Sequence, residues 1–280
     1  MNGDLHIHTS VSDGSVPPSE IVGKALEGGL GFLAVTDHNS VGALREVERS
    51  LSGGHPRFIY GVELSAQPDE GHEIHVLGYG VDPDCRALLD ACREIKGLKR
   101  EQLHEIVSRL RQDGVDIDIQ RVFVEDEEAY VGRPVVAELL VRNGVVSSLG
   151  QAFGRYLGRD APAFVRMRPF SPQRCIEAVH EAGGLAVLAH PYIETVDRWL
   201  EPLARMGLDG VEAYRPAPSG NEELYVEKAA EHFALFVTGG SDWHGREGEA
   251  PLGTFNVRED QMRGFFDALA RHRRGEAPRR

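Results

Sequence analysis

The 280-residue sequence lacks the features of a membrane protein or of a protein from an oxidising compartment. Its three cysteines, Cys85, Cys92 and Cys175, are an odd number without the CxxC spacing of a structural zinc site, which favours a reduced protein. Its apolar runs are short, and "GGLAVLAH" at residues 183–190 is far below the length that spans a bilayer. The first residues show neither the basic start nor the apolar core of a signal peptide. We therefore expect a cytoplasmic protein with no membrane partner.

Basic residues are also scarce relative to acidic ones. Lys and Arg number 31 against 44 Asp and Glu, which gives a formal net charge of -13. Because a protein that wraps long nucleic acid generally needs a basic face, the sequence argues against a long nucleic acid partner. A small anionic substrate is still compatible, since bound divalent ions can be the largest local charges in a site. The sequence indicates no particular oligomeric state.

The sequence does contain a repeated alternation of short apolar runs and helical patterns. The strand candidates are "DLHIH", "FLAVTDH", "RFIYGVELS", "HEIHVLGYG", "LAVLAHP", "GVEAY" and "LFVTGGSDWH". The first helical candidate, "PSEIVGKALEGG", has Pro17 and Pro18 at its start and Gly28-Gly29 at its end, as helices commonly do. This alternation predicts an α/β fold in which a mostly parallel sheet closes into a TIM-like barrel.

Residues 84–170 break the alternation, because they show several helical stretches and little strand pattern. We expect residues 1–83 and 171–280 to form the barrel, which is the catalytic domain. Residues 84–170 are then a helical insertion that caps the substrate side of the barrel. The acidic run "VEDEEA" at 124–129 is expected to be a solvated loop.

Histidines and carboxylates gather at the ends of the predicted strands. In a parallel barrel the loops that follow the strands share one face, which is where such enzymes hold their chemistry. A lone histidine is more often structural than a ligand, but a set drawn from six strands is hard to attribute to chance. The candidate metal ligands are His6, His8, Asp13, His38, Glu63, His75, His190, Asp242 and His244. Such a set suits Zn²⁺, Mn²⁺ or Fe²⁺ and predicts a multinuclear site, because a carboxylate can bridge two ions.

These residues lie in motifs that resemble the PHP (polymerase and histidinol phosphatase) family of metal-dependent phosphoesterases. The matching stretches are "LHIHTSVSDG", "TDHN", "GVELS", "IHVLGY", "LAHP" and "SDWHG". They occur in the family's order and span nearly the whole chain outside the insertion. The resemblance implies a distorted (β/α)7 TIM-like barrel with a trinuclear centre of three divalent metal ions per chain.

The resemblance also implies how the ligands are shared among the ions. The implied sets are His6, His8, Glu63 and Asp242 for the first ion, Glu63, His75 and His190 for the second, and Asp13, His38 and His244 for the third. Asp13 stands where some branches of the family have a histidine. Asp4 and Asp37 lie beside ligands and are expected to support them rather than to bind an ion. The remaining histidines expected at the surface are His55, His104, His180, His232 and His272.

Clustered divalent ions suit the hydrolysis of phosphate esters. They lower the pKa of a bound water from about 15.7 towards ~7, and they neutralise the oxyanions of the transition state. We expect the attacking group to be a hydroxide that bridges the first two ions, while the third ion holds a phosphate oxygen. His244 or His190 is the candidate proton donor to the leaving alkoxide, although metal ligation competes with that role.

Arginines of the insertion are the candidate substrate contacts. Arg133, in "GRPVVAELL", stands at a predicted helix start, where a guanidinium and free backbone N–H groups can both face an anion. Arg155, in "FGRYL", is the second candidate. The insertion resembles that of a PHP branch whose members act on nucleoside 3′,5′-bisphosphates and on related 5′-phosphorylated RNA ends. That branch has patterns close to "GRPH", "KYL" and "PAYVP", where this chain has "GRPV", "RYL" and "PAFVR".

The resulting prediction is a metal-dependent phosphoesterase for a small phosphate ester, such as a nucleoside 3′,5′-bisphosphate or a related nucleotide monoester. One alternative is a phosphodiesterase that acts on the cyclic phosphate of a phosphorylated sugar, because another member type of the same branch does so. A non-catalytic metal-binding module would be expected to show eroded ligand motifs, which this chain lacks. Hydrolysis of C–N bonds, which related barrels perform, is a third alternative that the arginines of the insertion disfavour.

Overall fold

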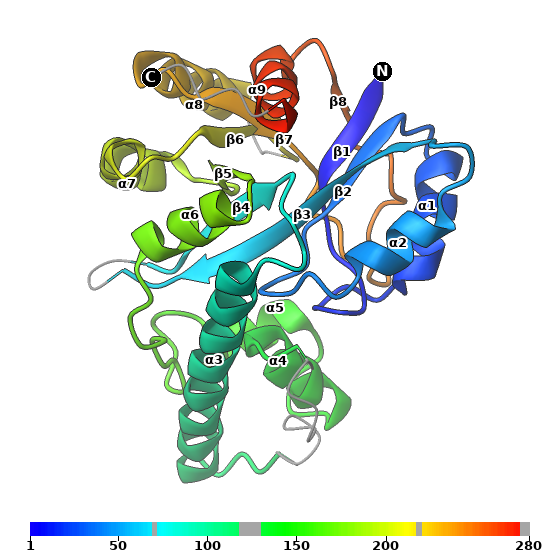
Figure 1. Cartoon of the computed structure of the whole chain (residues 1–280). Coiled ribbons are helices and arrows are strands. Elements are labelled where there is room, and N and C mark those ends of the chain that lie inside the picture. Colours follow the sequence, from blue (N-terminus) through cyan, green and yellow to red (C-terminus); the bar gives the residue numbers. More distant parts are fainter. Residues whose placement is uncertain (69–71, 118–129, 217–219, 275–280) are drawn as a thin grey trace. The chain divides into compact units, whose positions relative to one another are not determined.

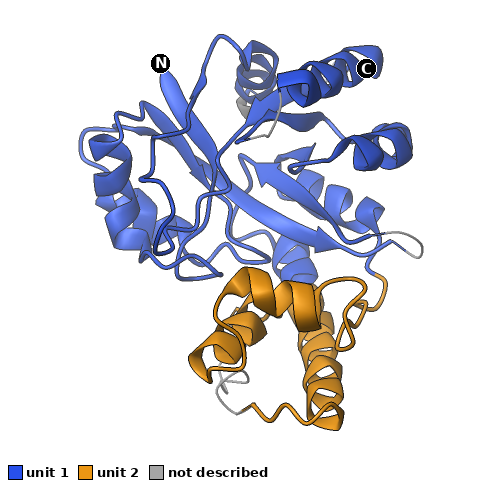
Figure 2. Cartoon of the chain, turned by 180° about the vertical axis from the view of Figure 1, so that it is seen from behind, with its two compact units in different colours: residues 1–92, 170–280 blue, residues 93–169 orange. Residues whose placement is uncertain are grey.

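The computed structural model describes residues 1–68, 72–117, 130–216 and 220–274. The chain forms two compact units, Met1–Cys92 with Phe170–Arg280, and Arg93–Pro169 (Figure 2). The second unit lies within the stretch expected to be the helical insertion, and helix α3 (Arg86–Gln112) runs across its first boundary. Among the described residues, no helix has the length and apolar composition needed to cross a membrane.

The first unit is built around one sheet (Figure 1). Its strands are β1 (Asn2–Ile7), β2 (Phe32–Val35), β3 (Arg57–Ala66), β4 (Ile74–Tyr79), β5 (Leu185–Leu188), β6 (Gly210–Tyr214), β7 (Phe236–Gly239) and β8 (Val257–Arg258). They are hydrogen-bonded in the order β7-β6-β5-β4-β3-β2-β1-β8. Each strand predicted from the sequence is present, and β8 is an addition that pairs antiparallel with the start of β1.

The two ends of the strand order approach each other where β1 ends and where the chain leaves β7. Ile7 forms a parallel bridge with Trp243, and the backbone N–H of His8 donates to the Trp243 carbonyl at 2.8 Å. This close approach depends on Gly240, because a Cβ there would lie 2.3 Å from the Cβ of His6. The sheet is therefore a nearly closed, distorted barrel, which confirms the predicted fold class.

Strand β4 runs in the direction opposite to its neighbours. It pairs antiparallel with both β3 and β5, whereas β1, β2 and β3 pair in parallel, as do β5, β6 and β7. An antiparallel pair needs only a short connection, and seven residues, 67–73, connect the end of β3 at Ala66 to the start of β4 at Ile74. The sequence analysis placed the candidate ligands at the ends of predicted strands, and this is wrong for His75, which lies at the start of β4.

Helices lie around this sheet (Figure 1). They are α1 (Pro18–Glu27), α2 (Leu44–Ser50), α6 (Pro172–Glu181), α7 (Ile193–Arg205), α8 (Gly220–His232) and α9 (Arg263–Arg273). In α7, Val196, Leu200 and Leu203 recur at helical spacing and are buried, so one face packs on the barrel. Helix α6 begins where the Ser171 hydroxyl accepts the N–H of Arg174 at 3.3 Å.

The second unit contains the rest of α3, α4 (Arg133–Arg142), α5 (Leu149–Ala152) and a π-helical turn at Phe153–Leu157. On α3, Leu103, Val107 and Leu110 share one face and are fully buried with Val136 and Leu140 of α4. This unit therefore has a hydrophobic core of its own. The acidic run at 124–129, predicted to be a solvated loop, lies outside the described residues.

Candidate metal centre

The structure gathers the candidate ligands at one end of the barrel in the first unit. They come from β1 (His6), the loop after β1 (His8, Asp13), the loop after β2 (His38), β3 (Glu63), the start of β4 (His75), and the loops after β5 (His190) and β7 (Asp242, His244). Because β4 is reversed, its first residues lie at the same end of the sheet as the last residues of β3 and β5. In three groups of these side chains, the ligand atoms all lie within 4.8 Å of one another.

The first group contains His6, His8, Glu63 and Asp242. Nε2 of His8 lies 3.0 Å from Oδ1 of Asp242 and 3.3 Å from Oε2 of Glu63. Nε2 of His6 lies 3.3 Å from each of the same two oxygens. Two imidazole nitrogens and two carboxylate oxygens therefore face a common point, which is a ligand set suited to a transition metal ion.

The second group contains His38, Glu63 and His75. Nδ1 of His38 lies 3.0 Å from Oε2 of Glu63, and Nδ1 of His75 lies 2.9 Å from the other oxygen, Oε1. His190 is not a member of this group but lies beside it, with Nε2 2.9 Å from Oε1 of Glu63 and 3.2 Å from Nδ1 of His75. Each oxygen of the Glu63 carboxylate thus faces a different set of imidazoles, as a bridging ligand would.

The third group surrounds Asp13. Oδ1 of Asp13 lies 3.2 Å from Nε2 of His244, 3.7 Å from Nδ1 of His8 and 3.9 Å from Nε2 of His38. His8 and His38 thus each touch two groups, one through each ring nitrogen, a sharing that the sequence patterns did not indicate. The three groups form one continuous cluster rather than separate sites.

Several ligand atoms in this cluster are buried without a hydrogen-bond partner among the described residues. They are Nε2 of His6, Nε2 of His8, Oδ1 of Asp13 and Oε2 of Glu63. Burying a polar or charged group costs free energy unless it is paired, so such atoms are rare in folded proteins. Here they point at one another across gaps of 3.0–3.9 Å, which is where cations would satisfy them. The residues therefore fit a bound metal cluster.

Electrostatics favour positive charge within the cluster. Burial lowers the pKa of the His8 imidazole, but Asp242 and Glu63 outweigh this effect and raise it to about 10. Burial likewise opposes the charged form of His75, yet Glu63 and Glu73 raise its pKa to about 9. Burial raises the pKa of Glu63, but the neighbouring imidazoles overcome it and hold the pKa well below the ordinary value. The carboxylates thus remain charged and stabilise cationic partners.

Glu212, in β6, orients two of the candidate ligands. Its Oε1 lies 3.0 Å from Nδ1 of His6, and its Oε2 accepts the backbone N–H of His190 at 2.8 Å. The contact fixes His6 so that Nε2 is directed into the first group. The sequence analysis did not select Glu212, although a single glutamate in the apolar strand "GVEAY" was a signal that could have found it.

Asp4 and Asp37 are buried and belong to none of the three groups. Asp4 accepts the backbone N–H groups of His6 and Ser241 at 3.0 Å each and the Ser241 hydroxyl at 2.6 Å, so it ties β1 to the loop that carries Asp242. Burial raises the pKa of Asp4 to about 6, although these hydrogen bonds oppose the rise. Asp37 accepts from the backbone N–H of Thr9 at 2.7 Å and from the Ser12 hydroxyl at 2.6 Å.

Further contacts set the orientation of the outer ligands. Nε2 of His75 lies 3.1 Å from a Glu73 oxygen, and Nδ1 of His244 lies 2.7 Å from the backbone carbonyl of Asp242. In each ring the other nitrogen then faces the cluster. Arg246, which the sequence analysis also missed, donates to Oδ2 of Asp13 at 3.1 Å and leaves Oδ1 for the third group.

Two candidate ligands adopt the left-handed backbone conformation, which residues other than glycine rarely adopt. Asp242 has φ 57° and His190 has φ 28°. Such conformations cost roughly 1–3 kcal/mol each and persist where the surrounding structure imposes them, which is common at functional sites. His190 lies two residues after the end of β5 and Asp242 three after the end of β7, so the chain turns sharply there and presents the side chain to the cluster.

The two arginines predicted to contact substrate belong to the second unit. Arg133 is the first residue of α4, and its guanidinium lies 5.8 Å from the centre of the Phe164 ring. Arg155 lies in the π-helical turn, 5.4 Å from the centre of the Tyr156 ring. Arg155 is exposed and Arg133 is partly buried.

The chain is similar to several proteins of named activity. The chain is 32% identical over 248 residues to the 5′-3′ exoribonuclease of Haemophilus influenzae, which covers 86% of this chain and 89% of that protein. It is 29% identical over 252 residues to the 3′,5′-nucleoside bisphosphate phosphatase of Chromobacterium violaceum, with 87% of each chain covered. It is 29% identical over 266 residues to the phosphoribosyl 1,2-cyclic phosphate 1,2-diphosphodiesterase of Eggerthella lenta, with 92% of this chain and 99% of that protein covered.

The fold has a counterpart among solved structures. The crystal structure of a proposed metal-dependent phosphoesterase from Bifidobacterium adolescentis superimposes with a TM-score of 0.81 and 28% identity, over 93% of this chain and 94% of that one. The sequence model of the PHP domain matches residues 4–143, which is half of the chain and includes the candidate ligands from His6 to His75. With this match and a relative that is 32% identical over 86% of the chain, the chain belongs to the PHP domain family.

Proposed function

We propose that this chain is a metal-dependent phosphoesterase that hydrolyses small phosphate esters. The observation that carries the proposal is the position of Glu63, whose two oxygens face two sets of imidazoles beside a third group around Asp13. A carboxylate shared between two closely spaced cation positions is typical of sites that hydrolyse phosphate esters.

The proposed cofactors are three divalent ions per chain, Mn²⁺, Fe²⁺ or Zn²⁺. The proposed ligand sets are His6, His8, Glu63 and Asp242, then Glu63, His75 and His190, and then Asp13, His38 and His244. The distances within each set support this assignment. When bound, such ions generate a nucleophile from water at neutral pH and neutralise charge on the phosphate.

His190 and His244 are the candidate proton donors to the leaving oxygen. A ring nitrogen that binds an ion carries no proton, so ligation and proton donation exclude each other at a given Nε2. His190→Asn and His244→Asn separate these roles. Loss of a ligand lowers the metal content, whereas loss of a proton donor lowers the rate at full metal content and does so less for esters with acidic leaving groups.

The substrate that we propose is a nucleotide, either a nucleoside 3′,5′-bisphosphate or a related nucleotide monoester. The relatives named bisphosphate phosphatase and exoribonuclease support this choice, because both names describe the hydrolysis of phosphate esters of nucleotides. The net charge of -13 argues against binding along a long nucleic acid, so we propose that RNA would be engaged only at its end. Arg133 and Arg155 are the proposed phosphate contacts.

A cyclic phosphodiester of a phosphorylated sugar is the second candidate substrate. The relative from Eggerthella lenta favours it, because that protein is named as a cyclic phosphate diphosphodiesterase and 92% of this chain is covered. Both candidate reactions need a cation cluster that holds a phosphate, so the same site serves either proposal.

Phosphate release from a panel of substrates tests the function. The panel contains a nucleoside 3′,5′-bisphosphate, 5′- and 3′-nucleotides, a 5′-phosphorylated oligoribonucleotide, a sugar phosphate and a cyclic phosphodiester. We expect the metal-loaded protein to hydrolyse the bisphosphate best, His6→Ala and Asp242→Ala to abolish activity, and His232→Ala, at an exposed histidine of α8, to leave it unchanged. Full activity in both site variants under limiting metal would refute the site, and hydrolysis of the cyclic compound alone would replace the substrate.

We also propose a reducing, cytoplasmic location. All three cysteines are free thiols, and two of them, Cys92 and Cys175, are buried. Fractionation of cells that produce the tagged protein tests the location, and recovery outside the cytoplasm would contradict it.

A further inference from the structure

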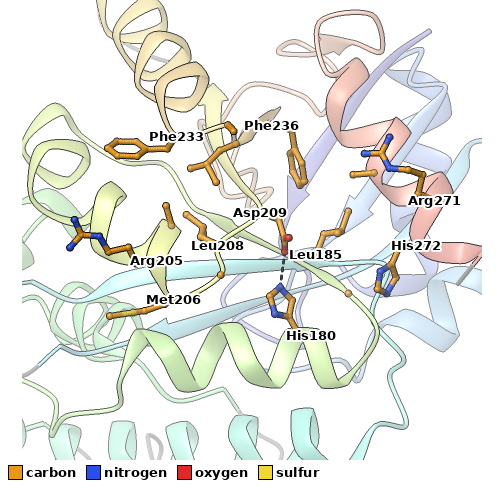
Figure 3. Close-up of a pocket in the computed structure, with 16 residues that line it drawn as sticks. His180, Leu185, Arg205, Met206, Leu208, Asp209, Phe233, Phe236, Arg271 and His272 are labelled. Atoms are coloured by element: carbon orange, nitrogen blue, oxygen red, sulfur yellow. Dashed lines mark hydrogen bonds and ion pairs between the residues drawn. The ribbon is translucent and has the colours of Figure 1, made fainter. Parts of the chain in front are cut away.

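A cavity of about 760 Å³ lies in the first unit, between the ends of helices α6, α7 and α9 (Figure 3). Its floor is formed where β5, β6 and β7 begin, at Leu185, Asp209 and Phe236. Pockets that hold small organic ligands commonly have volumes of roughly 300–1,000 Å³. The cavity is therefore large enough to be a binding site.

This cavity is separate from the candidate metal centre. Strands β5, β6 and β7 are parallel, the cavity lies at their first residues, and His190 and Asp242 follow their last residues. Leu185 and His190 are five residues apart, which corresponds to about 15 Å along an extended strand. A molecule in this cavity would thus lie at the opposite end of the strands from the metal ligands.

Apolar side chains that face the cavity are incompletely covered. Phe233, Leu235 and Phe236 are only partly buried, although the barrel core next to them is fully buried. The nearby backbone N–H groups of Leu208 and Phe236 already donate to Leu203 and Asp209. The lining therefore offers apolar contact but few unused backbone donors, which suits a ligand with an apolar body.

Basic side chains line the same cavity. Arg271 and His272 of α9 lie on one side of it, Arg205 lies on the other, and the His180–Asp209 pair lies between them (Figure 3). Asp209 is the only carboxylate among the described lining residues. Its Oδ2 is already engaged by Nε2 of His180 and by the N–H of Ala186, each at 2.8 Å.

The side chains of Arg271 and His272 are partly buried, and neither has an ion pair or hydrogen bond with any other residue that the structure describes. This is unusual in an acidic chain, where arginines such as Arg45, Arg168 and Arg258 pair with carboxylates. Arg205, across the cavity, also pairs with Glu201 of its own helix. A partly buried guanidinium that lines the same cavity as partly covered phenylalanines is suited to the acidic head group of a ligand.

We propose that this cavity is a second ligand-binding site, for a small organic anion with an apolar body and one acidic head group. The apolar body lies against Phe233 and Phe236, and the head group pairs with Arg271. The head group is a carboxylate, sulfonate or phosphate, because each is an anion that a guanidinium binds. The inference does not rest on the proposed phosphoesterase activity, because it uses none of the residues of the metal centre.

The fluorescence of 8-anilinonaphthalene-1-sulfonate tests the proposal, because this probe is an anion with an apolar aromatic body. We expect saturable binding of one probe per chain to the full-length protein. Arg271→Gln weakens this binding at least tenfold, as the loss of a charge-assisted contact does. Ala268→Trp, which fills the cavity from α9, abolishes it. The matched control is Arg263→Gln, on the same helix but outside the cavity, and it leaves binding unchanged.

His6→Ala distinguishes this site from the metal centre, and we expect that variant to bind the probe as the original protein does. Loss of binding in His6→Ala, or equal binding in the original protein, Arg271→Gln and Ala268→Trp, would overturn the proposal. Circular dichroism of each variant excludes loss of folding as the cause. Competition by a long-chain carboxylate or by a nucleoside monophosphate then identifies which head group the cavity prefers.

Discussion

Replacement of Glu212 by Gln tests whether the buried carboxylate behind the cluster controls metal binding. Glu212 receives two hydrogen-bond donors, Nδ1–H of His6 on Oε1 and the backbone N–H of His190 on Oε2. A glutamine side chain carries no charge and offers one acceptor oxygen and one NH₂ group. Glu212→Gln preserves the shape of the side chain but removes the negative charge from both contacts. If its oxygen stays with the N–H of His190, Nδ1 of His6 keeps only the longer contact of 3.2 Å, to Oε2.

The size of the effect follows from the burial of the partners. His6 is 0% exposed and Glu212 is 1% exposed, so water cannot replace the lost contact. A buried hydrogen bond that involves a charged group contributes about 1.5–3 kcal/mol. Mutation of a residue that orients a metal-binding histidine typically weakens metal affinity by about tenfold to a hundredfold. We expect a loss of that size for ions held by the His6 and His190 groups, and no loss at the Asp13 group.

The assay is the metal content of the purified protein after equilibration with a series of chelator concentrations, measured by elemental analysis at fixed pH. Glu227→Gln is the matched control, because Glu227 is also paired, with the Tyr214 hydroxyl of β6, but lies outside the metal groups. We expect Glu212→Gln to release part of its metal at a lower chelator concentration than either the original protein or the control. Identical release curves for all three proteins would refute the orienting role of Glu212.

Three further perturbations test other parts of the structure. Gly240→Ala would place a Cβ 2.3 Å from the Cβ of His6, so we expect a destabilisation of about 1–3 kcal/mol and weaker metal binding. Its control in denaturant unfolding is Gly23→Ala, whose added Cβ would meet no atom within 4 Å apart from its own helix backbone and chain neighbours. Removal of metal by chelation should lower the midpoint of thermal unfolding, because ions bound to the native state stabilise it. This drop in midpoint should be smaller in Glu63→Gln than in the original protein. Equal drops in the two proteins would argue against Glu63 as a ligand. The hydrogen bond with Asp209 raises the pKa of His180, so its contribution to stability is present below the ordinary histidine pKa and is lost as the pH rises through the raised value. The free energy of unfolding of the original protein minus that of His180→Gln, measured from pH 5 to 9, should show this decline. A difference that is constant with pH would contradict it.

Much of the fold and the candidate site could be predicted because local patterns specify them. The strands alternate with amphipathic helices, and the histidines and carboxylates lie in short motifs at strand ends, where the connectivity of a barrel brings them together. Glu63 illustrates this well, since its place in "GVELS" marked it as a ligand candidate. That each of its two oxygens faces a different set of imidazoles follows from the structure alone.

Other features depend on contacts between distant segments and could not be read from the sequence. The apolar run around β4 has the same pattern in either direction, so its reversal was not predicted. His180, on an amphipathic helix, and His272, near a helix end, were expected at the surface; His180 is exposed and His272 is partly buried. That both line one cavity, where the ends of α6 and α9 come together, was not predicted. The partner of Glu212 is His6, at the other end of the chain, and no local signal links the two.

The bridge between Ile7 and Trp243 has a consequence for the order in which the protein matures. His6 and His8 are synthesised before Asp242 of the same ligand group, which lies 234 residues beyond His8. A growing chain therefore holds an incomplete ligand group until β7 and the loop after it have left the ribosome and joined β1. If the metal binds as proposed, it links β1 to the loop after β7 only once these segments have met, and amide hydrogen exchange along β1 should then report whether the centre is loaded.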